Sequence, residues 1–363
     1  MEQSSHQREV RLVDPAWSLS ELMARLAKAL VSDGPALALA PISREAVASR
    51  ISLVVNTTGS SGKVKEVGLS AHSLLASAKA SNSFIGAKIG DSWSLLLPLN
   101  HIAGINVLLR SLELGTIPLD FRNFPNEPSH KYANADFSAI VPTQLFRALN
   151  GDSELLNHLR GCRAVLVGGA RLSHELRSQA RENGINVIET YGSTETSGGC
   201  IYDGQPLEGV EIQINEKNQL QIKGAVLAHS YLNSEDSIND AEGWYTTSDL
   251  AHFEGERVVI DGRIDDVFIT GGENISLSSI EEIISARFPS LQLAAFTIAD
   301  MQWGESLCCA IIDSDSSIEA EIQKVLSETI GDAAKVKRFL YLKELPLLGI
   351  GKVDRAELGR LIS

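Results

Sequence analysis

The first periodic pattern in the chain lies between residues 17 and 34. Leucines recur there at every fourth position, at Leu22, Leu26 and Leu30. This spacing places the three side chains on one face of a helix. Ser18 and Glu21 precede the run at the distance of a capping box, and Gly34 follows it as the expected end of the helix.

A strand and a loop of small residues come next. Residues 51–55, ISLVV, are apolar and β-branched, and they predict a buried strand. The strand runs into residues 57–65, TTGSSGKVK, and a helix is expected at 70–86. We therefore expect the loop within a βα crossover, at the carboxyl end of a strand, where open α/β sheets bind ligands.

The same order returns at residues 162–195. A strand precedes a turn at Gly168 and Gly169, a helix capped by Ser173 and closed near Gly184 follows, and a second strand ends the segment. This order predicts a βαβ unit, in which the strands run parallel and the helix packs across them.

The pattern changes from about residue 205, where short alternating runs predict antiparallel hairpins. The charged, turn-like residues 262–268, GRIDDVF, mark an expected domain boundary. A helix is expected beyond it, with Ser279 and Glu282 as its capping box. Its apolar face would consist of Ile280, Ile283 and Ile284.

These elements predict an α/β protein with two domains. The large N-terminal domain, residues 1–264, is expected to hold a parallel sheet and an antiparallel, barrel-like portion. Residues 265–363 are expected to form a small α+β domain. The length of 363 residues agrees, because it exceeds what one hydrophobic core usually serves.

Composition narrows the classes of function. The net charge of −14 argues against a general nucleic-acid binder and against a protein held on anionic membrane, because both need a basic surface. No segment approaches the roughly 18 apolar residues of a membrane span, so we expect no membrane insertion. The four cysteines include no CxxC and two are adjacent, which indicates a reducing compartment, and the first ten residues lack the apolar core of a signal peptide. We expect a cytoplasmic protein.

Residues 57–65 allow two interpretations. Small residues can form a slack linker, or they can let backbone N–H groups converge on an anion while hydroxyls and lysines add donors and charge. The position after a buried strand favours the anion site. A Walker loop is excluded, because Thr57 stands where its first glycine belongs and Val64, not a hydroxyl residue, follows Lys63.

The loop resembles the phosphate loop of the adenylate-forming superfamily, which includes acyl-CoA synthetases, adenylation domains and luciferases. That loop usually reads TSGTTGxPKG, and this chain has Val64 and Glu66 where proline and glycine are usual. Glu66 would place negative charge near a triphosphate. The resemblance implies that ATP and AMP are bound by Thr57, Thr58, Gly59, Ser60, Ser61, Gly62 and Lys65.

Further motifs follow in the order of that superfamily. YGSTET, residues 191–196, matches the segment that approaches the α-phosphate. The resemblance implies nucleotide contacts from Tyr191, Gly192 and Ser193 and catalytic roles for Thr194 and Glu195. Glu195 would bind Mg²⁺, a hard cation for which a carboxylate and water are suitable ligands.

The ribose and the hinge are marked by two later motifs. Asp249 in YTTSDLA matches the aspartate that accepts hydrogen bonds from both ribose hydroxyls, and a carboxylate suits a vicinal diol because it offers only acceptors. Arg263 matches a residue that contacts ribose or phosphate. Asp265 stands where the superfamily pivots its C-terminal domain.

The last two motifs concern the thiol and the catalytic lysine. Gly271 and Gly272 in TGGENIS match the segment that lines the tunnel for the thiol of coenzyme A. Lys352 in PLLGIGKVDR matches the lysine that reaches the reacting carboxylate and phosphate oxygens during adenylation.

Residues 73–115 indicate which carboxylic acid the enzyme would activate. They resemble the o-succinylbenzoate–CoA ligases of menaquinone biosynthesis, in particular their short actinobacterial form, which lacks most of the first subdomain. Within the adenylate-forming superfamily PxxHxxG, here with His101, marks a segment beside the acyl pocket, and we expect a catalytic role for His101 as well. Both His101 and Arg110 are candidates for the distal carboxylate, and both also have a structural interpretation. The remaining pocket wall, shared in part with adenine, would consist of Gly168, Gly169, Ala170 and Gly192.

The resemblance therefore implies an acid–thiol ligase that uses ATP, Mg²⁺ and coenzyme A to make the CoA thioester of o-succinylbenzoate. One alternative is a ligase, or an enzyme that loads a carrier protein, for another small aryl or acyl acid. Another is a nucleotide-binding member without catalysis. The sequence leaves open whether the chain forms a homodimer.

Overall fold

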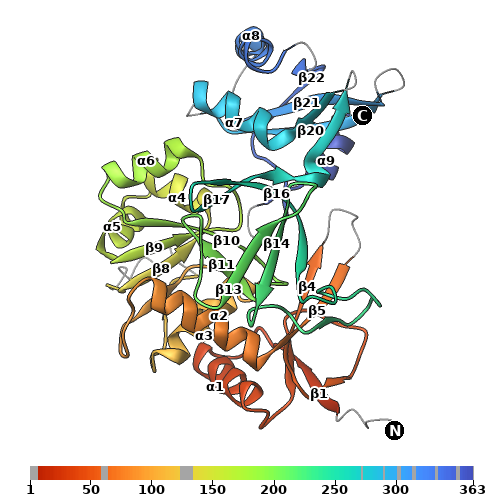
Figure 1. Cartoon of the computed structure of the whole chain (residues 1–363). Coiled ribbons are helices and arrows are strands. Elements are labelled where there is room, and N and C mark those ends of the chain that lie inside the picture. The colour runs from red at the N-terminus through yellow and green to blue at the C-terminus, as the bar shows by residue number, and fades with distance from the viewer. Residues whose placement is uncertain are drawn as a thin grey trace. The chain divides into compact units, whose positions relative to one another are not determined.

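The computed structural model describes residues 7–58, 64–122, 134–270, 273–288, 291–300, 304–312, 316–331, 334–348 and 352–362. The chain forms two compact units. Figure 1 shows the whole chain, coloured by residue number from red at the N-terminus to blue at the C-terminus. The first consists of Met1–Leu172, Leu176–Gln213 and Gln221–Thr246, and the second of Ser173–Glu175, Ile214–Leu220 and Thr247–Ser363. The domain boundary expected between residues 264 and 265 stays a prediction.

One sheet of the first unit has the strand order β15-β5-β4-β2-β1-β3. β1, β2 and β4 run parallel, whereas β5 is antiparallel to β4, and β15 is antiparallel to β5. The apolar run at 51–55 is buried within β4, as expected. The strands are β1 Gln7–Leu12, β2 Ala36–Ala38, β3 Ala46–Ala48, β4 Ile51–Thr58, β5 Val64–Ser70 and β15 Ser230–Tyr231.

The connection after β4 differs from the expectation. The sequence predicts a βα crossover, but the chain returns at once as β5, and Thr57 pairs with Lys65 in an antiparallel ladder. Helix α2, Ala71–Phe84, begins only after β5, with Ser70 as its N-cap. The βα interpretation is wrong because residues 64–70 are short and partly polar, and only their pairing with β4 identifies them as a strand.

The other sheet of this unit has the order β12-β11-β10-β9-β8-β6-β7. β7, β6, β8, β9 and β10 are parallel neighbours, and β11 and β12 add antiparallel strands at one side. The βαβ unit predicted at 162–195 is confirmed. The strands are β6 Trp93–Leu95, β7 Leu119–Asp120, β8 Phe137–Ile140, β9 Ala164–Val167, β10 Val187–Ser193, β11 Gly198–Tyr202 and β12 Gln205–Pro206.

Helices cover this sheet (Figure 1). Side chains of α4, α5 and α6 form one hydrophobic cluster with Val165 and Val167 of β9. α3 contacts β6 and β11, and α2 contacts α3 and β11. The helices are α1 Leu19–Leu30, α2, α3 Ile102–Glu113, α4 Pro142–Leu149, α5 Ser153–Gly161 and α6 His174–Glu182.

Helix α1 begins where the sequence predicts. The Ser18 hydroxyl accepts a hydrogen bond from the Glu21 backbone N–H at 3.2 Å. The helix ends at Leu30, and the left-handed residue after it is Ser32, with φ of 59°. Gly34 is therefore not its end; its carbonyl accepts hydrogen bonds from Arg8 instead.

A further sheet has the order β13-β14-β16-β17. β16 and β17 form an antiparallel hairpin, which agrees with the alternation read from residue 205 onward. Its strands are β13 Val210–Ile214, β14 Gln219–Gly224, β16 Tyr245–Glu254 and β17 Arg257–Arg263.

The C-terminal part of the second unit is a small α+β fold, as expected. The sheet β20-β21-β22 lies between α7 and α8, on one face, and α9 on the other. Its elements are β18 Val267–Thr270, β19 Glu273–Ser276, β20 Leu293–Asp300, β21 Gly304–Ile312, β22 Arg338–Leu342, β23 Leu347–Leu348, β24 Lys352–Val353, α7 Leu277–Arg287, α8 Glu319–Thr329 and α9 Arg355–Ile362, with short 3-10 turns at Ile264–Asp266 and Ser316–Ile318.

The adjacent cysteines illustrate the two faces of this sheet. Cys309 belongs to the cluster with α7 and α8, whereas Cys308 belongs to the cluster with Leu358 of α9. Successive side chains of a strand point to opposite faces, so the two thiols point apart. All four cysteines are free and buried.

The start of α7 corrects another expectation. Ile280 and Ile284 are fully buried and Ile283 packs beside them, as the pattern predicts. The N-cap is Ser276, three residues before Ser279, so Ser279 lies inside the helix and its capping role is wrong. Among the described residues, each helix is too short or too polar to cross a lipid bilayer.

Candidate active site

The carboxyl ends of β6, β9 and β10 gather most of the predicted acyl and phosphate residues of the first unit. These strands belong to one parallel ladder, so their carboxyl ends meet at the same edge of the sheet. His101 lies beyond β6, the segment Gly168–Ala170 follows β9, and Thr194 and Glu195 follow β10. The sequence order thus brings them to one edge.

Two glycines of this edge are required by close packing. A Cβ atom on Gly168 would lie 2.2 Å from the Thr190 hydroxyl oxygen, and one on Gly192 would lie 2.0 Å from the Gly198 carbonyl oxygen. Real Cβ contacts are far longer, so neither position accepts a side chain without a backbone shift. Gly169 is also constrained, because its φ is 83°.

The turn between β10 and β11 holds two of the predicted catalytic residues, Thr194 and Glu195. The Thr196 hydroxyl accepts a hydrogen bond from the Ser193 N–H at 2.8 Å and lies 2.7 Å from the Gly198 carbonyl, to which it can donate. The Asn106 amide donates to the Ser197 carbonyl at 3.0 Å. These bonds fix the backbone on both sides of Thr194 and Glu195, which are both buried.

Glu195 contacts a residue that no motif identifies. The Tyr231 hydroxyl donates to Glu195 Oε1 at 3.2 Å, and the Ala228 N–H donates to the Glu195 carbonyl at 2.7 Å. Burial and the Glu195 charge raise the pKa of Tyr231 well above its ordinary value, so the phenol stays protonated at neutral pH. The Lys65 ammonium lies over the Tyr231 ring, 4.6 Å from its centroid.

The structure also explains Glu66, the departure from the family pattern. Its carboxylate accepts hydrogen bonds from the Ser43 N–H at 3.0 Å and from the Ser43 hydroxyl at 3.3 Å, and the residue is buried. The Asn233 side chain accepts from the Glu66 N–H at 2.9 Å. The carboxylate is therefore bound to Ser43, and the effect of its charge on a triphosphate stays a prediction.

His101 stands at the N-cap position of α3, without a side-chain capping bond. Three residues later, a Cβ atom on Gly104 would lie 2.2 Å from the Pro98 carbonyl oxygen. The spacing PxxHxxG therefore has a packing basis, because the first turn of α3 rests directly on the Pro98 carbonyl.

Arg110, the other candidate for a distal carboxylate, lies further along α3 and is 5% exposed. Its guanidinium donates to the Tyr202 hydroxyl at 3.2 Å and lies over the Trp93 ring at 5.0 Å. Its Nε is buried without a hydrogen-bond partner. Among the described residues, no carboxylate forms an ion pair with Arg110, so its charge is not compensated there.

In the second unit, Asp249 and Arg263 form a cross-strand pair of β16 and β17. Their side chains lie 3.6 Å apart, and the Asp249 carboxylate is the more buried partner. The Asp249 N–H donates to the Thr247 hydroxyl at 3.0 Å, which fixes the backbone there. The structure thus brings together the two predicted ribose residues, and their roles stay predictions.

Several predicted site residues lie outside the described part of the structure. These are Gly59, Ser60, Ser61, Gly62, Gly271 and Gly272, together with the side chains of Thr58, Asp265 and Lys352. The backbone of Asp265 forms part of the turn before β18, and that of Lys352 pairs with Leu348.

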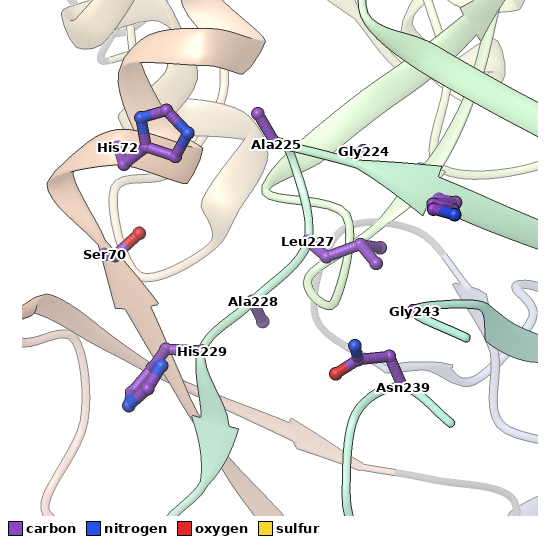
Figure 2. A pocket seen from close by; sticks show the side chains of 10 residues that line it. Ser70, His72, Gly224, Ala225, Leu227, Ala228, His229, Asn239 and Gly243 are labelled. Carbon is purple, nitrogen blue, oxygen red and sulfur yellow. The ribbon is translucent and has the colours of Figure 1, made fainter. Parts of the chain in front are cut away.

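A cavity of about 410 Å³ lies in the first unit (Figure 2). Residues from Ala225 to His229 run along it, and His72, from the first turn of α2, also lines it. It shares its wall with the segment that supports Glu195, since Ala228 both lines the cavity and donates to the Glu195 carbonyl. None of the predicted site residues is among the described residues that line it.

Comparison with known proteins identifies the family. Residues 2–233 match the family described as AMP-binding enzyme, which is more than half of the chain. The chain belongs to the AMP-binding enzyme family. The resemblance of its motifs to the adenylate-forming superfamily is therefore confirmed, and so is the expected fold of a large α/β part with a small C-terminal part.

Relatives of this AMP-binding enzyme cover it almost completely. It is 33% identical over 373 residues to a probable 2-succinylbenzoate–CoA ligase of Mycobacterium tuberculosis, a match that covers 95% of this chain and 96% of the relative. Among solved structures it is similar to a single-residue variant of Escherichia coli MenE with bound OSB-AMS, with a TM-score of 0.75 and 26% identity over 97% of this chain and 81% of that one. The Bacillus subtilis o-succinylbenzoate CoA synthetase in complex with ATP and magnesium shares the fold, with a TM-score of 0.73 and 22% identity over 96% and 83%.

Sequence reasoning missed the residues that support the motif residues. Tyr231 lies in AHSYLN, where nothing distinguishes it from a core tyrosine, and Asn106 lies inside an apolar helical run. Ser43 is one serine among many. Their contacts join segments far apart in the chain, and no local pattern records such contacts.

Proposed function

We propose that this AMP-binding enzyme is a 2-succinylbenzoate–CoA ligase. The observation that carries the proposal is the 33% identity to the M. tuberculosis relative over nearly the full length of both chains. The similarity to E. coli MenE with bound OSB-AMS supports the same acid, because it extends over 97% of this chain.

The proposed reaction has two steps. A carboxylate oxygen of the acid attacks the α-phosphorus of ATP, the bond to the bridging oxygen breaks, and pyrophosphate leaves with the electron pair. The resulting acyl-adenylate is then attacked by the thiol of coenzyme A, and AMP leaves. The first step joins two anions, so the protein must supply positive charge and orientation rather than a base.

The described residues fit a magnesium ion that arrives with the nucleotide. Among them, no three side chains of His, Cys, Asp or Glu gather as a metal site of their own. Glu195 offers a buried carboxylate, and Tyr231 is bound to only one of its oxygens. Mg²⁺ commonly binds through one or two carboxylates together with substrate phosphates, where it neutralises their charge. In this proposal Glu195 holds the ion, and Thr194 and Lys65 contact phosphate oxygens.

Arg110 supports an acid with a second carboxylate. A buried guanidinium without a compensating anion is costly, and Arg110 keeps an unused N–H donor at Nε. A dicarboxylate would supply the missing charge. Of the two candidates left open by the sequence, the structure therefore favours Arg110, and His101 stays a candidate for the acyl pocket and for catalysis.

The proposal includes further residue roles that the described residues do not test. They are the catalytic role of Lys352, the hinge at Asp265 between residues 1–264 and 265–363, and the thiol tunnel at Gly271 and Gly272. Cytoplasmic localisation and the oligomeric state, homodimer or not, also stay predictions.

Acid-dependent exchange of pyrophosphate into ATP tests the proposal. The wild-type enzyme is expected to catalyse exchange with 2-succinylbenzoate and to form its CoA thioester when coenzyme A is added. Lys352→Ala should lose on the order of a hundredfold in exchange, because it removes one preorganised charge from the transition state. Exchange with another acid from a panel, but not with 2-succinylbenzoate, would contradict the substrate; exchange without thioester formation from free coenzyme A would favour a carrier-loading enzyme.

A further inference from the structure

Tyr231 lies at a position from which it reaches two predicted site residues. It pairs with Val67 in the ladder of β15 and β5, and Lys65 lies two residues from Val67. Residues two apart in a strand share a face, and residues directly opposite in a ladder share it too. Tyr231 and Lys65 therefore stand on the same face of the sheet, where the ammonium lies 4.6 Å from the ring centroid.

The other end of the Tyr231 side chain reaches Glu195. Its hydroxyl donates to Oε1 at 3.2 Å, while the Ala228 N–H of the same segment donates to the Glu195 carbonyl at 2.7 Å. Glu195 is thus held at its main chain and at its side chain by residues 228–231. The hydrogen bond to Oε1 therefore restricts the orientation of the carboxylate.

We infer that Tyr231 is a positioning residue that orients Glu195 for a divalent cation and holds Lys65 beside it. The inference rests on the proposed function only in that Glu195 and Lys65 bind the metal and the phosphates of ATP. The hydroxyl acts on the metal ligand, and the ring acts on the lysine, so the two effects can be separated by substitution.

Tyr231→Phe removes the hydroxyl and keeps the ring. It is expected to weaken binding of Mn²⁺, used in place of Mg²⁺, in the presence of the non-hydrolysable nucleotide α,β-methylene-ATP. Loss of such a partner of a metal ligand typically costs on the order of tenfold in affinity. Free and bound Mn²⁺ are distinguished by electron paramagnetic resonance, which needs no turnover. Tyr231→Leu, which also removes the ring, should in addition weaken binding of the nucleotide itself.

Tyr341→Phe is the matched control. Its hydroxyl also donates to a glutamate, Glu319, at 2.5 Å, but on the exposed surface of the second unit. This variant should bind Mn²⁺ as the wild type does. In a Glu195→Gln background, Tyr231→Phe should have no further effect on Mn²⁺ binding, because the residue it acts through is gone.

Two results would overturn the inference: wild-type Mn²⁺ affinity in Tyr231→Phe, or an equal loss from Tyr231→Phe with and without Glu195. Failure of the proposed function is a separate result. If no acid in the panel supported exchange, the ligase assignment would fall, while Mn²⁺ binding, which needs no acid, would still decide the role of Tyr231.

Discussion

Lys65 and Glu66 are neighbours in β5 and direct their opposite charges to opposite faces of the sheet. Lys65 lies over the Tyr231 ring, whereas the Glu66 carboxylate is bound by the N–H and hydroxyl of Ser43. The alternation of a strand requires this separation. The Glu66 carboxylate, which the sequence suggests would lie near a triphosphate, is a buried group bound to Ser43.

Glu66→Gly, which restores the residue usual in the family, should destabilise this protein. It removes two hydrogen bonds to a buried carboxylate and leaves the Ser43 donors unpaired, a loss of about 2 kcal/mol in the free energy of unfolding. Denaturant unfolding measures this change. Glu66→Gln keeps an acceptor for Ser43 and should lose less. If Glu66→Gly instead kept its stability and accelerated pyrophosphate exchange, the charge would act on the phosphates after all.

Gly104→Ala should disturb the start of α3. The new Cβ would lie 2.2 Å from the Pro98 carbonyl oxygen, and overpacking of this kind costs about 1–3 kcal/mol. We expect a lower melting temperature by circular dichroism and, if His101 lines the acyl pocket, a higher KM for the acid. Gly359→Ala in α9 is the matched control, because no atom lies within 4 Å of the added methyl group and alanine favours a helix. A variant at position 104 as stable as the wild type would show that the contact relaxes freely.

The sequence predicts the elements that carry a strong local period. The leucines of α1 with its Ser18 cap, the apolar centre of β4 and the βαβ unit at 162–195 all appear in the structure where the pattern places them. The motif residues at the ends of β9 and β10 come together because parallel strands must align their carboxyl ends. In these segments, local sequence and tertiary structure agree.

The predictions that failed concern features that local periodicity does not encode. β5 is a strand because of its pairing with β4, and the helix α7 begins at Ser276 although Ser279 has the better capping spacing. The contact of Tyr231 with Lys65 links residues more than a hundred positions apart, its hydrogen bond to Glu195 links residues 36 apart, and the contact of Glu66 with Ser43 links residues 23 apart. The hydrophobic periodicity of the sequence does not predict such pairs.

The four thiols should be unreactive in the folded protein. Burial raises the pKa of Cys162 and Cys200 to about 12 and that of Cys308 to about 11, and the pKa of Cys309 is also raised. Only the thiolate reacts, so labelling by a disulfide reagent at neutral pH should be slow until the chain unfolds. Each raised pKa contributes stability that is present below the ordinary thiol value near 9 and is lost as pH rises through the folded value. Rapid labelling of the native protein at pH 7.5 would contradict this burial.

Arg110→Met tests whether Arg110 binds the distal carboxylate of the substrate, and the measured quantity is KM for two different acids. The variant loses the charge proposed to bind a distal carboxylate, and hydrogen bonds to charged groups contribute about 1.5–3 kcal/mol, so KM for 2-succinylbenzoate should rise on the order of tenfold or more. The analogue 4-oxo-4-phenylbutanoate, which lacks the ring carboxylate, should show no such rise. Tyr202→Phe removes the hydroxyl that orients the guanidinium at 3.2 Å and keeps the charge, so its effect should be smaller and in the same direction. Equal losses with both acids would mean that Arg110 supports the interior packing against Trp93 and does not recognise the substrate.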